Sequence, residues 1–196
     1  MIILPFRRVT PAVNLVRPGS QNFLTPGTYN FTVPNYHNLT ADARGAGGGG
    51  GGWRHSDTNI YYGGGGGYSY FNAGGNVVGY GGAGGAGAED YAGTSNYGTA
   101  AAGTAVNGDS NIAGGGSSGG TYAVGGVSGV YSYHGESGGP GGRAYRTFTR
   151  ASGILLPGTT IQVVVGYGGA AGTVEPANVI AYSTAGQDGA VYISWN

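Results

Sequence analysis

Runs of glycine between Gly45 and Gly142 constrain the fold of this chain more than any other feature. They contain most of the 47 glycines among the 196 residues, in blocks such as GAGGGGGG, GGGGG, GYGGAGGAG and GGPGG. Each glycine loses more conformational freedom on folding than any other residue, roughly 0.5–1 kcal/mol relative to alanine. The stretch is therefore either disordered or built so that backbones approach where no side chain fits.

The composition favours an ordered stretch. Disordered chains are typically rich in charge and poor in aromatic residues, whereas only 8% of this chain is charged and 16 residues are tyrosine. Glycine runs can adopt an extended helix with three residues per turn and hydrogen-bond side by side. Gly47 to Gly52 would span roughly 19 Å in that form. We expect polyglycine-II-like helices and loops, with irregular loops alone as the alternative.

Alternating apolar residues on both sides of the glycine stretch predict an all-β fold. The expected strands are residues 28–34, 38–44, 144–150, 159–165, 179–182 and 189–195. The residues expected to face inward are Tyr29, Phe31, Val33, Leu39, Ala41, Ala43, Val191, Ile193 and Trp195. Residues 166–172 read as a glycine-rich hairpin or bulge. No segment has convincing helical spacing.

The domain organisation follows from where this alternation begins. Residues 1–27 carry four prolines and little periodicity, which predicts an extended N-terminal anchoring arm. Its apolar start would form an interaction patch if exposed, and comprises Ile2, Ile3, Leu4 and Phe6. Residues 28–196 would form a glycine-rich β domain, with residues 45–142 as a large glycine-rich insertion.

Residue types exclude several functions. The net charge is zero, with no basic run, so a nucleic-acid partner is not expected. The chain has no lysine and no cysteine, which excludes a phosphate-binding P-loop, Schiff-base chemistry and cysteine-ligated metals. His55 with Asp57, and His134 with Glu136, could pair as metal ligands, but polar loops are the simpler interpretation because structural sites need three or four ligands. We expect no enzymatic activity, cofactor or metal.

The order of these features resembles a known family. An FTVP strand, an alternating strand entering GAGGGGGG, a glycine- and tyrosine-rich middle, LPGTTIQVVVGYGGAAG and a closing DGAVYISW are similar to the glycine-rich domain of bacteriophage tail-fibre and related virion proteins. The resemblance covers residues 28–195. It implies a β-sandwich framework with a glycine-rich insertion, a place in the virion, other virion subunits as partners and a homo-oligomer, most commonly a trimer. In composition the chain also resembles phage tail-tip adhesins.

Segments between the glycine runs have the composition of binding loops. Tyrosine and tryptophan offer rigid apolar faces with a polar tip, and serine, glycine and asparagine offer adaptable hydrogen bonds. We expect contact with a host-surface glycan or outer-membrane protein through Trp53, His55, Tyr61, Tyr62, Tyr68, Tyr70, Tyr131, Tyr133 and His134. These aromatic residues could equally seal the glycine layers. A purely structural virion protein, such as a capsid decoration, is the alternative; an ice-binding protein is disfavoured by the irregular spacing.

Overall fold

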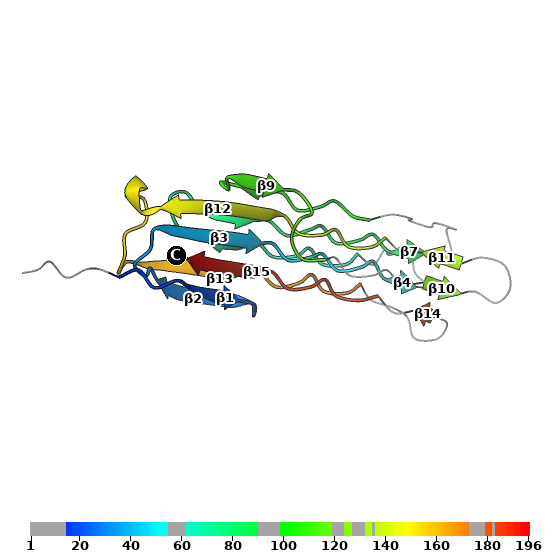
Figure 1. Ribbon diagram of the computed structural model, residues 1–196. Coiled ribbons are helices and arrows are strands. Elements are labelled where there is room, and N and C mark those ends of the chain that lie inside the picture. The colour runs from blue at the N-terminus through cyan, green and yellow to red at the C-terminus, as the bar shows by residue number, and fades with distance from the viewer. Residues whose placement is uncertain are drawn as a thin grey trace, which may run out of the picture.

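The molecule is elongated, with two β-sheets at one end and glycine-rich segments running away from them (Figure 1). The computed structural model describes residues 15–54, 62–89, 99–118, 124–126, 132–134, 136–172, 179–181 and 183–196. Within these residues the regular structure is strand, apart from one 3₁₀ turn at Arg150–Ser152. The all-β class expected from the sequence is therefore confirmed.

Two five-stranded antiparallel sheets form the wide end, with strand orders β1-β15-β3-β12-β9 (sheet A) and β2-β13-β5-β6-β8 (sheet B). The strands of sheet A are β1 (Gly19–Phe23), β15 (Ala190–Trp195), β3 (Asn38–Arg44), β12 (Arg143–Thr149) and β9 (Ser110–Ile112). Those of sheet B are β2 (Gly27–Thr32), β13 (Thr160–Val165), β5 (Ser69–Phe71), β6 (Val77–Gly79) and β8 (Ala105–Val106).

One hydrophobic core joins the two sheets. Alternate residues of a strand point to the same face, and the inward residues of β3 are fully buried as expected: Leu39, Ala41 and Ala43. Phe71 of sheet B connects the two sides, because its ring centroid lies 6.1 Å from that of Phe31 in its own sheet and 5.7 Å from that of Phe148 in sheet A. The core therefore holds the sheets against each other and fixes the direction in which their strands leave.

The strands expected from alternation are present, with ends shifted by at most two residues. Two expectations need correction. Gly19–Phe23 was assigned to the arm, but these residues form β1 and pair with β15 along their whole length. Residues 166–172 are not a hairpin, because they continue β13 as a single extended segment. The apolar arm residues Ile2, Ile3, Leu4 and Phe6 lie outside the described residues.

Seven extended segments, each joined directly to a strand of a sheet, form a bundle beyond the sheets (Figure 1). Three run away from the sheets: 45–52 after β3, 80–87 after β6 and 166–172 after β13. Four return: 62–68 before β5, 99–104 before β8, 136–142 before β12 and 183–189 before β15. Two of the seven thus come from outside the expected insertion at 45–142.

Segment 45–52, here the central segment, donates backbone hydrogen bonds to three neighbours in rotation. Positions 45, 48 and 51 donate to segment 136–142, positions 46 and 49 to segment 62–68, and positions 47 and 50 to segment 183–189, with N···O distances of 2.8 to 3.0 Å. The hydrogen-bond pattern therefore repeats every three residues. A β-strand, in contrast, has a two-residue period and bonds to neighbours on two sides only.

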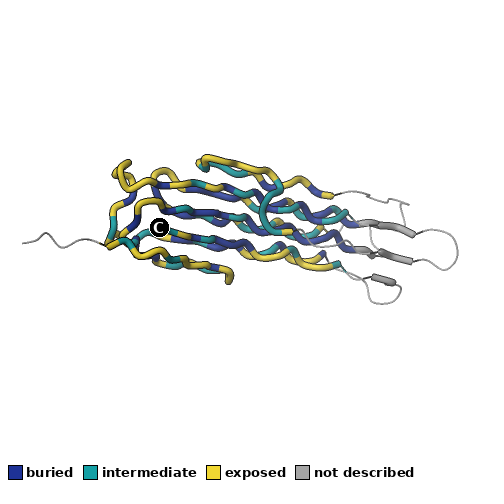
Figure 2. Tube along the Cα trace, viewed as in Figure 1, coloured by how far each residue is buried: buried dark blue, intermediate teal, exposed yellow. Residues whose placement is uncertain are grey.

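The carbonyl oxygens of the central segment accept bonds from further neighbours. Segment 80–87 donates to positions 46 and 49, and segment 166–172 donates to positions 47 and 50. Residues 116–118 fill the remaining place, since Ser117 N–H donates to Gly45 O at 3.0 Å and Ser118 O accepts from Gln187 N–H at 3.0 Å. The central segment is thus enclosed on all sides, and Figure 2 shows buried residues continuing from the sheets into the bundle.

Side chains cannot fit between these segments. A Cβ added at Gly48 would lie 1.9 Å from the carbonyl oxygen of Ala83, and one added at Gly49 would lie 1.8 Å from that of Ala170. Both distances are far inside van der Waals contact, and the obstructing atoms are backbone atoms that the hydrogen bonds hold in place. The alanines themselves, Ala83 and Ala170, lie at exposed positions. Glycine is therefore required at inward positions such as 48 and 49, although the buried Ala46 shows that a methyl group fits at one place in the same segment.

We predict that Gly48→Ala lowers the free energy of unfolding by about 3 kcal/mol, because the new methyl group must push two hydrogen-bonded segments apart. Gly65→Ala is the matched control, since a Cβ there would meet nothing closer than Gly82 O at 3.8 Å. The control should stay within about 1 kcal/mol of the parent protein. Urea unfolding followed by tyrosine and tryptophan fluorescence measures both; equal losses would contradict close packing around the central segment.

Candidate functional site

The end of the bundle farthest from the sheets collects short strands from separate parts of the chain (Figure 1). β4 (Trp53–Arg54) pairs in parallel with β7 (Ala88–Glu89). β10 (Val124–Gly126) pairs with both β11 (Ser132–His134) and β14 (Val179–Ala181). We call this region the distal end. It lies beyond the last glycines of the bundle, opposite the shared core.

The distal end brings together several residues that the sequence singled out for binding. Trp53 lies in β4, and Tyr133 and His134 lie in β11. Tyr62 begins the returning segment 62–68 and is exposed. Three further candidates, His55, Tyr61 and Tyr131, lie outside the described residues.

Three stretches of sequence that follow distal strands have related compositions. Residues 55–61 (HSDTNIY) follow β4, residues 90–98 (DYAGTSNYG) follow β7 and residues 127–131 (VSGVY) separate β10 from β11. Tyrosine and serine occur in all three, and threonine and asparagine occur in the first two. These residue types make adaptable noncovalent contacts to polar surfaces.

Tyr68 and Tyr70 are separated from the distal candidates. They lie at the sheet end, where segment 62–68 enters β5, and their rings stack with centroids 5.8 Å apart and planes 18° apart. The Tyr70 hydroxyl donates a hydrogen bond to the side chain of Gln162, which holds that ring against sheet B. A tyrosine next to a glycine run in the sequence can therefore lie either at the distal end or in a sheet, and the sequence did not distinguish the two.

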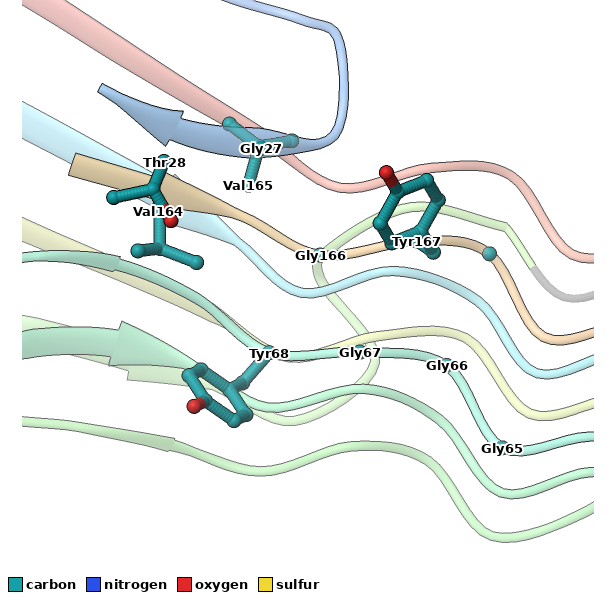
Figure 3. A pocket seen from close by; sticks show the side chains of 11 residues that line it. Gly27, Thr28, Gly65, Gly66, Gly67, Tyr68, Val164, Val165, Gly166 and Tyr167 are labelled. Carbon is teal, nitrogen blue, oxygen red and sulfur yellow. The ribbon is translucent and has the colours of Figure 1, made fainter.

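A groove lies beside Tyr68, where sheet B meets the bundle (Figure 3). It has a volume of about 400 Å³, and its walls come from segments 62–68 and 166–172 and the ends of β2 and β13. Tyr68 and Tyr167 line it and are 53% and 70% exposed. The sequence analysis did not single out Tyr167. A repeated tetrapeptide, Tyr-Gly-Gly-Ala at 80–83 and again at 167–170, was the available signal.

An ion cluster stands on the outer face of sheet A. Asp42 of β3 is only 6% exposed and accepts two hydrogen bonds of 2.8 Å from the guanidinium of Arg143 in β12. Arg44 donates to the same carboxylate at 2.9 Å, and its guanidinium carbon lies 4.6 Å from the centre of the Tyr192 ring. Burial raises the pKa of Asp42, but the hydrogen bonds and charges of Arg143 and Arg44 outweigh this and lower it below its ordinary value. The cluster links β3 to β12 at the edge of sheet A that adjoins the bundle.

The described residues contain no group of three or more His, Asp or Glu side chains placed to hold a metal ion. Within the same residues no helix is long and apolar enough to cross a membrane. The polar chemistry in the described part of the chain is that of hydrogen bonds, ion pairs and aromatic faces.

Comparison of the chain with models of protein families, with curated proteins and with solved structures gives no match. What the distal end and the groove do must therefore be inferred from their geometry and from the sequence.

We predict that Asp42→Asn destabilises the protein at neutral pH by about 1.5–3 kcal/mol, the range for hydrogen bonds to charged groups. Because the pKa of Asp42 is lowered by folding, its contribution is full above its unfolded pKa of about 4 and is lost as the pH falls through the folded value. Urea unfolding from pH 7 to pH 2 should thus show the parent and variant converging in acid.

A double-mutant cycle with Arg143→Met supplies the control for this prediction. A coupling free energy near zero, or a stability difference that is constant with pH, would contradict the assigned role of the pair.

Proposed function

We propose that this chain is a non-enzymatic bacteriophage virion protein, a tail-fibre or tail-tip component that binds a host-surface receptor. The observation that carries the proposal is the three-residue hydrogen-bond rotation around the central segment, with the candidate residues Trp53, Tyr133 and His134 in the strands at its far end. Such a bundle would act as a stiff support for the polar and aromatic stretches. The sequence resemblance to phage tail-fibre domains supplies the class of protein.

The bundle is best interpreted as a set of polyglycine-II-like helices. That conformation has three residues per turn and a rise of about 3.1 Å, so successive N–H groups point in three directions. The rotation of hydrogen bonds from positions 45, 46 and 47 to three different segments matches it. On this geometry the eight residues of the central segment span about 25 Å. The two sheets with their common core are correspondingly interpreted as the β-sandwich framework implied by the resemblance.

The two ends of the molecule suggest a division of roles. The described chain starts at the sheet end, where Leu15 is exposed, so the residues before it would anchor the protein to another virion subunit there. The distal end would then point toward the host. A glycan or an outer-membrane protein fits its tyrosine, serine and asparagine side chains, because rigid aromatic rings and short polar groups bind polar surfaces at low entropic cost. Assembly as a trimer follows from the resemblance alone.

A purely structural virion protein is the second candidate. The sheet end favours it, because large apolar side chains are exposed there, among them Leu24, Ile154 and Leu156. Such residues suit packing against other subunits. In that case the distal residues would only seal the bundle, and the protein would have no affinity for the host.

We predict that purified protein binds host cells and reduces phage adsorption by competition. Replacing residues 55–61 by a glycine–serine segment of equal length should abolish both effects while leaving the circular dichroism and the unfolding midpoint unchanged. Ile154→Ser, at the opposite end, is the control and should bind cells normally. Protein that is inert toward cells, yet copurifies with assembled particles, would favour the structural alternative.

A second prediction concerns the arm. Deleting residues 1–14 should prevent incorporation into particles without affecting folding, because the first strand of sheet A begins at Gly19. Electron microscopy of particles from a complemented mutant, together with the unfolding curve of the truncated chain, measures the two effects. Normal incorporation of the truncated chain would refute the anchoring role.

A further inference from the structure

The repeated tetrapeptide Tyr-Gly-Gly-Ala marks two equivalent places in the bundle, and within the residues that the structure describes only one of them has a segment docked on it. At the first, in segment 80–87, the N–H groups of Tyr80 and Ala83 donate to carbonyl oxygens of segment 99–104, each at 2.9 Å. Segment 99–104 in turn donates two bonds to segment 136–142. It therefore lies outside the ring around the central segment, in the groove between two ring members.

The second tetrapeptide, at 167–170, has the same relations to its neighbours. Both segments donate hydrogen bonds to the central segment from residues two and five positions after the tyrosine. In segment 80–87 these donors are Gly82 and Gly85, and in segment 166–172 they are Gly169 and Gly172. In both, the carbonyl oxygens of the tyrosine and the alanine accept bonds from a returning segment, which is 136–142 for the first and 62–68 for the second. The pair formed by 166–172 and 62–68 thus repeats the arrangement of the pair formed by 80–87 and 136–142.

No described segment is docked on the second pair. The N–H groups of Tyr167 and Ala170 correspond to those of Tyr80 and Ala83, yet neither donates to an acceptor among the residues that the structure describes. Both nitrogens lie beside segment 62–68, because a Cβ at Gly67 would lie 3.1 Å from Tyr167 N and one at Gly64 would lie 2.9 Å from Ala170 N. The groove lined by Tyr68 and Tyr167 opens at the sheet end of this same pair (Figure 3).

We propose that the groove between segments 62–68 and 166–172 is a docking site for an extended, glycine- and alanine-rich segment of a partner protein. The segment lies along this pair as residues 99–104 lie along the pair formed by 80–87 and 136–142. It accepts hydrogen bonds from the N–H groups of Tyr167 and Ala170 and donates to segment 62–68. This interaction surface is separate from the distal end and does not depend on what the distal end binds.

Residues 99–104, with the sequence TAAAGT, indicate which residues a segment docked in the groove must have. Its residues facing the groove must be small, because Ala100 and Gly103 are buried there and a Cβ at Gly103 would lie 2.2 Å from Tyr80 O. Its other positions are less restricted, since Ala101 and Ala102 are exposed. Glycine or alanine at every third position is therefore the recognition signal. Tyr68 and Tyr167 would cover the end of the segment nearest the sheets.

The test uses the full chain, labelled with ¹⁵N, and a capped synthetic peptide with the sequence of residues 99–104 at millimolar concentration. The amide signals of Tyr167 and Ala170 should shift, and their hydrogen exchange should slow severalfold, because they gain acceptors. A peptide with valine in place of the residue corresponding to Gly103 is the control and should leave both signals unchanged.

A matched pair of proline variants separates docking from folding. Ala170→Pro removes an N–H that has no acceptor in the described structure, and proline suits an extended backbone, as Pro140 in segment 136–142 illustrates. It should abolish the peptide-induced shift at Tyr167 with an unchanged unfolding midpoint. Ala83→Pro removes the existing bond to Ala101 and should lower the unfolding midpoint. Ala170→Ser keeps the N–H and should bind the peptide like the parent.

Three results would overturn the proposal, and all three are measured on the unaltered protein. Unchanged Tyr167 and Ala170 signals would show that the groove does not bind such a segment. Shifts confined to Tyr80 and Ala83 would mean that the peptide only displaces residues 99–104. Shifts of Tyr167 and Ala170 produced by an oligosaccharide such as maltotriose, with the peptide inert, would assign the groove to sugars instead.

Discussion

The structure depends on backbone hydrogen bonds that run in three directions from a chain without side chains. A β-strand satisfies its backbone with two neighbours, whereas the central segment uses donors and acceptors all around its axis. This is possible only where no Cβ intervenes, as at Gly48 and Gly49. The hydrogen bonds of the bundle oppose the conformational entropy that so many glycines lose on folding. The large apolar side chains of the core, in contrast, lie between and around the two sheets.

The sheets were largely predictable because their information is local. The alternation in residues 38–44 specifies both the strand and its buried face, and β3 has those bounds. The glycine segments carry no such periodicity, so nothing local distinguished residues 166–172 from a hairpin or placed Tyr70 in a sheet. Contacts such as Asp42 with Arg143 join residues 101 positions apart, and only the register between β3 and β12 brings them together. The recurrence of Tyr-Gly-Gly-Ala was the one sequence signal that indicated that segments 80–87 and 166–172 are equivalent.

Inward and outward positions of the bundle tolerate different side chains, and this difference determines where candidate sites can lie. Inward positions such as 48 and 49 admit only glycine, while outward positions such as Ala83 and Tyr167 are free to vary. Side chains that can adapt to a partner are therefore found at outward positions of the bundle, whereas aromatic residues such as Phe71 and Phe148 fill the core between the sheets. A scaffold of this kind separates what must be kept, the glycines, from what can be adapted to a partner.

The order in which the segments occur along the chain also has a kinetic consequence. The central segment is early in the sequence, yet its partners are distant: Ser183 Oγ donates to Gly50 O across 133 positions. Such non-local contacts require large loops to close before any bond can form, which slows folding. Glycine runs also have little tendency to form structure alone. We expect the sheets, which have the hydrophobic core, to assemble first and align the seven segments, so that the bundle closes late.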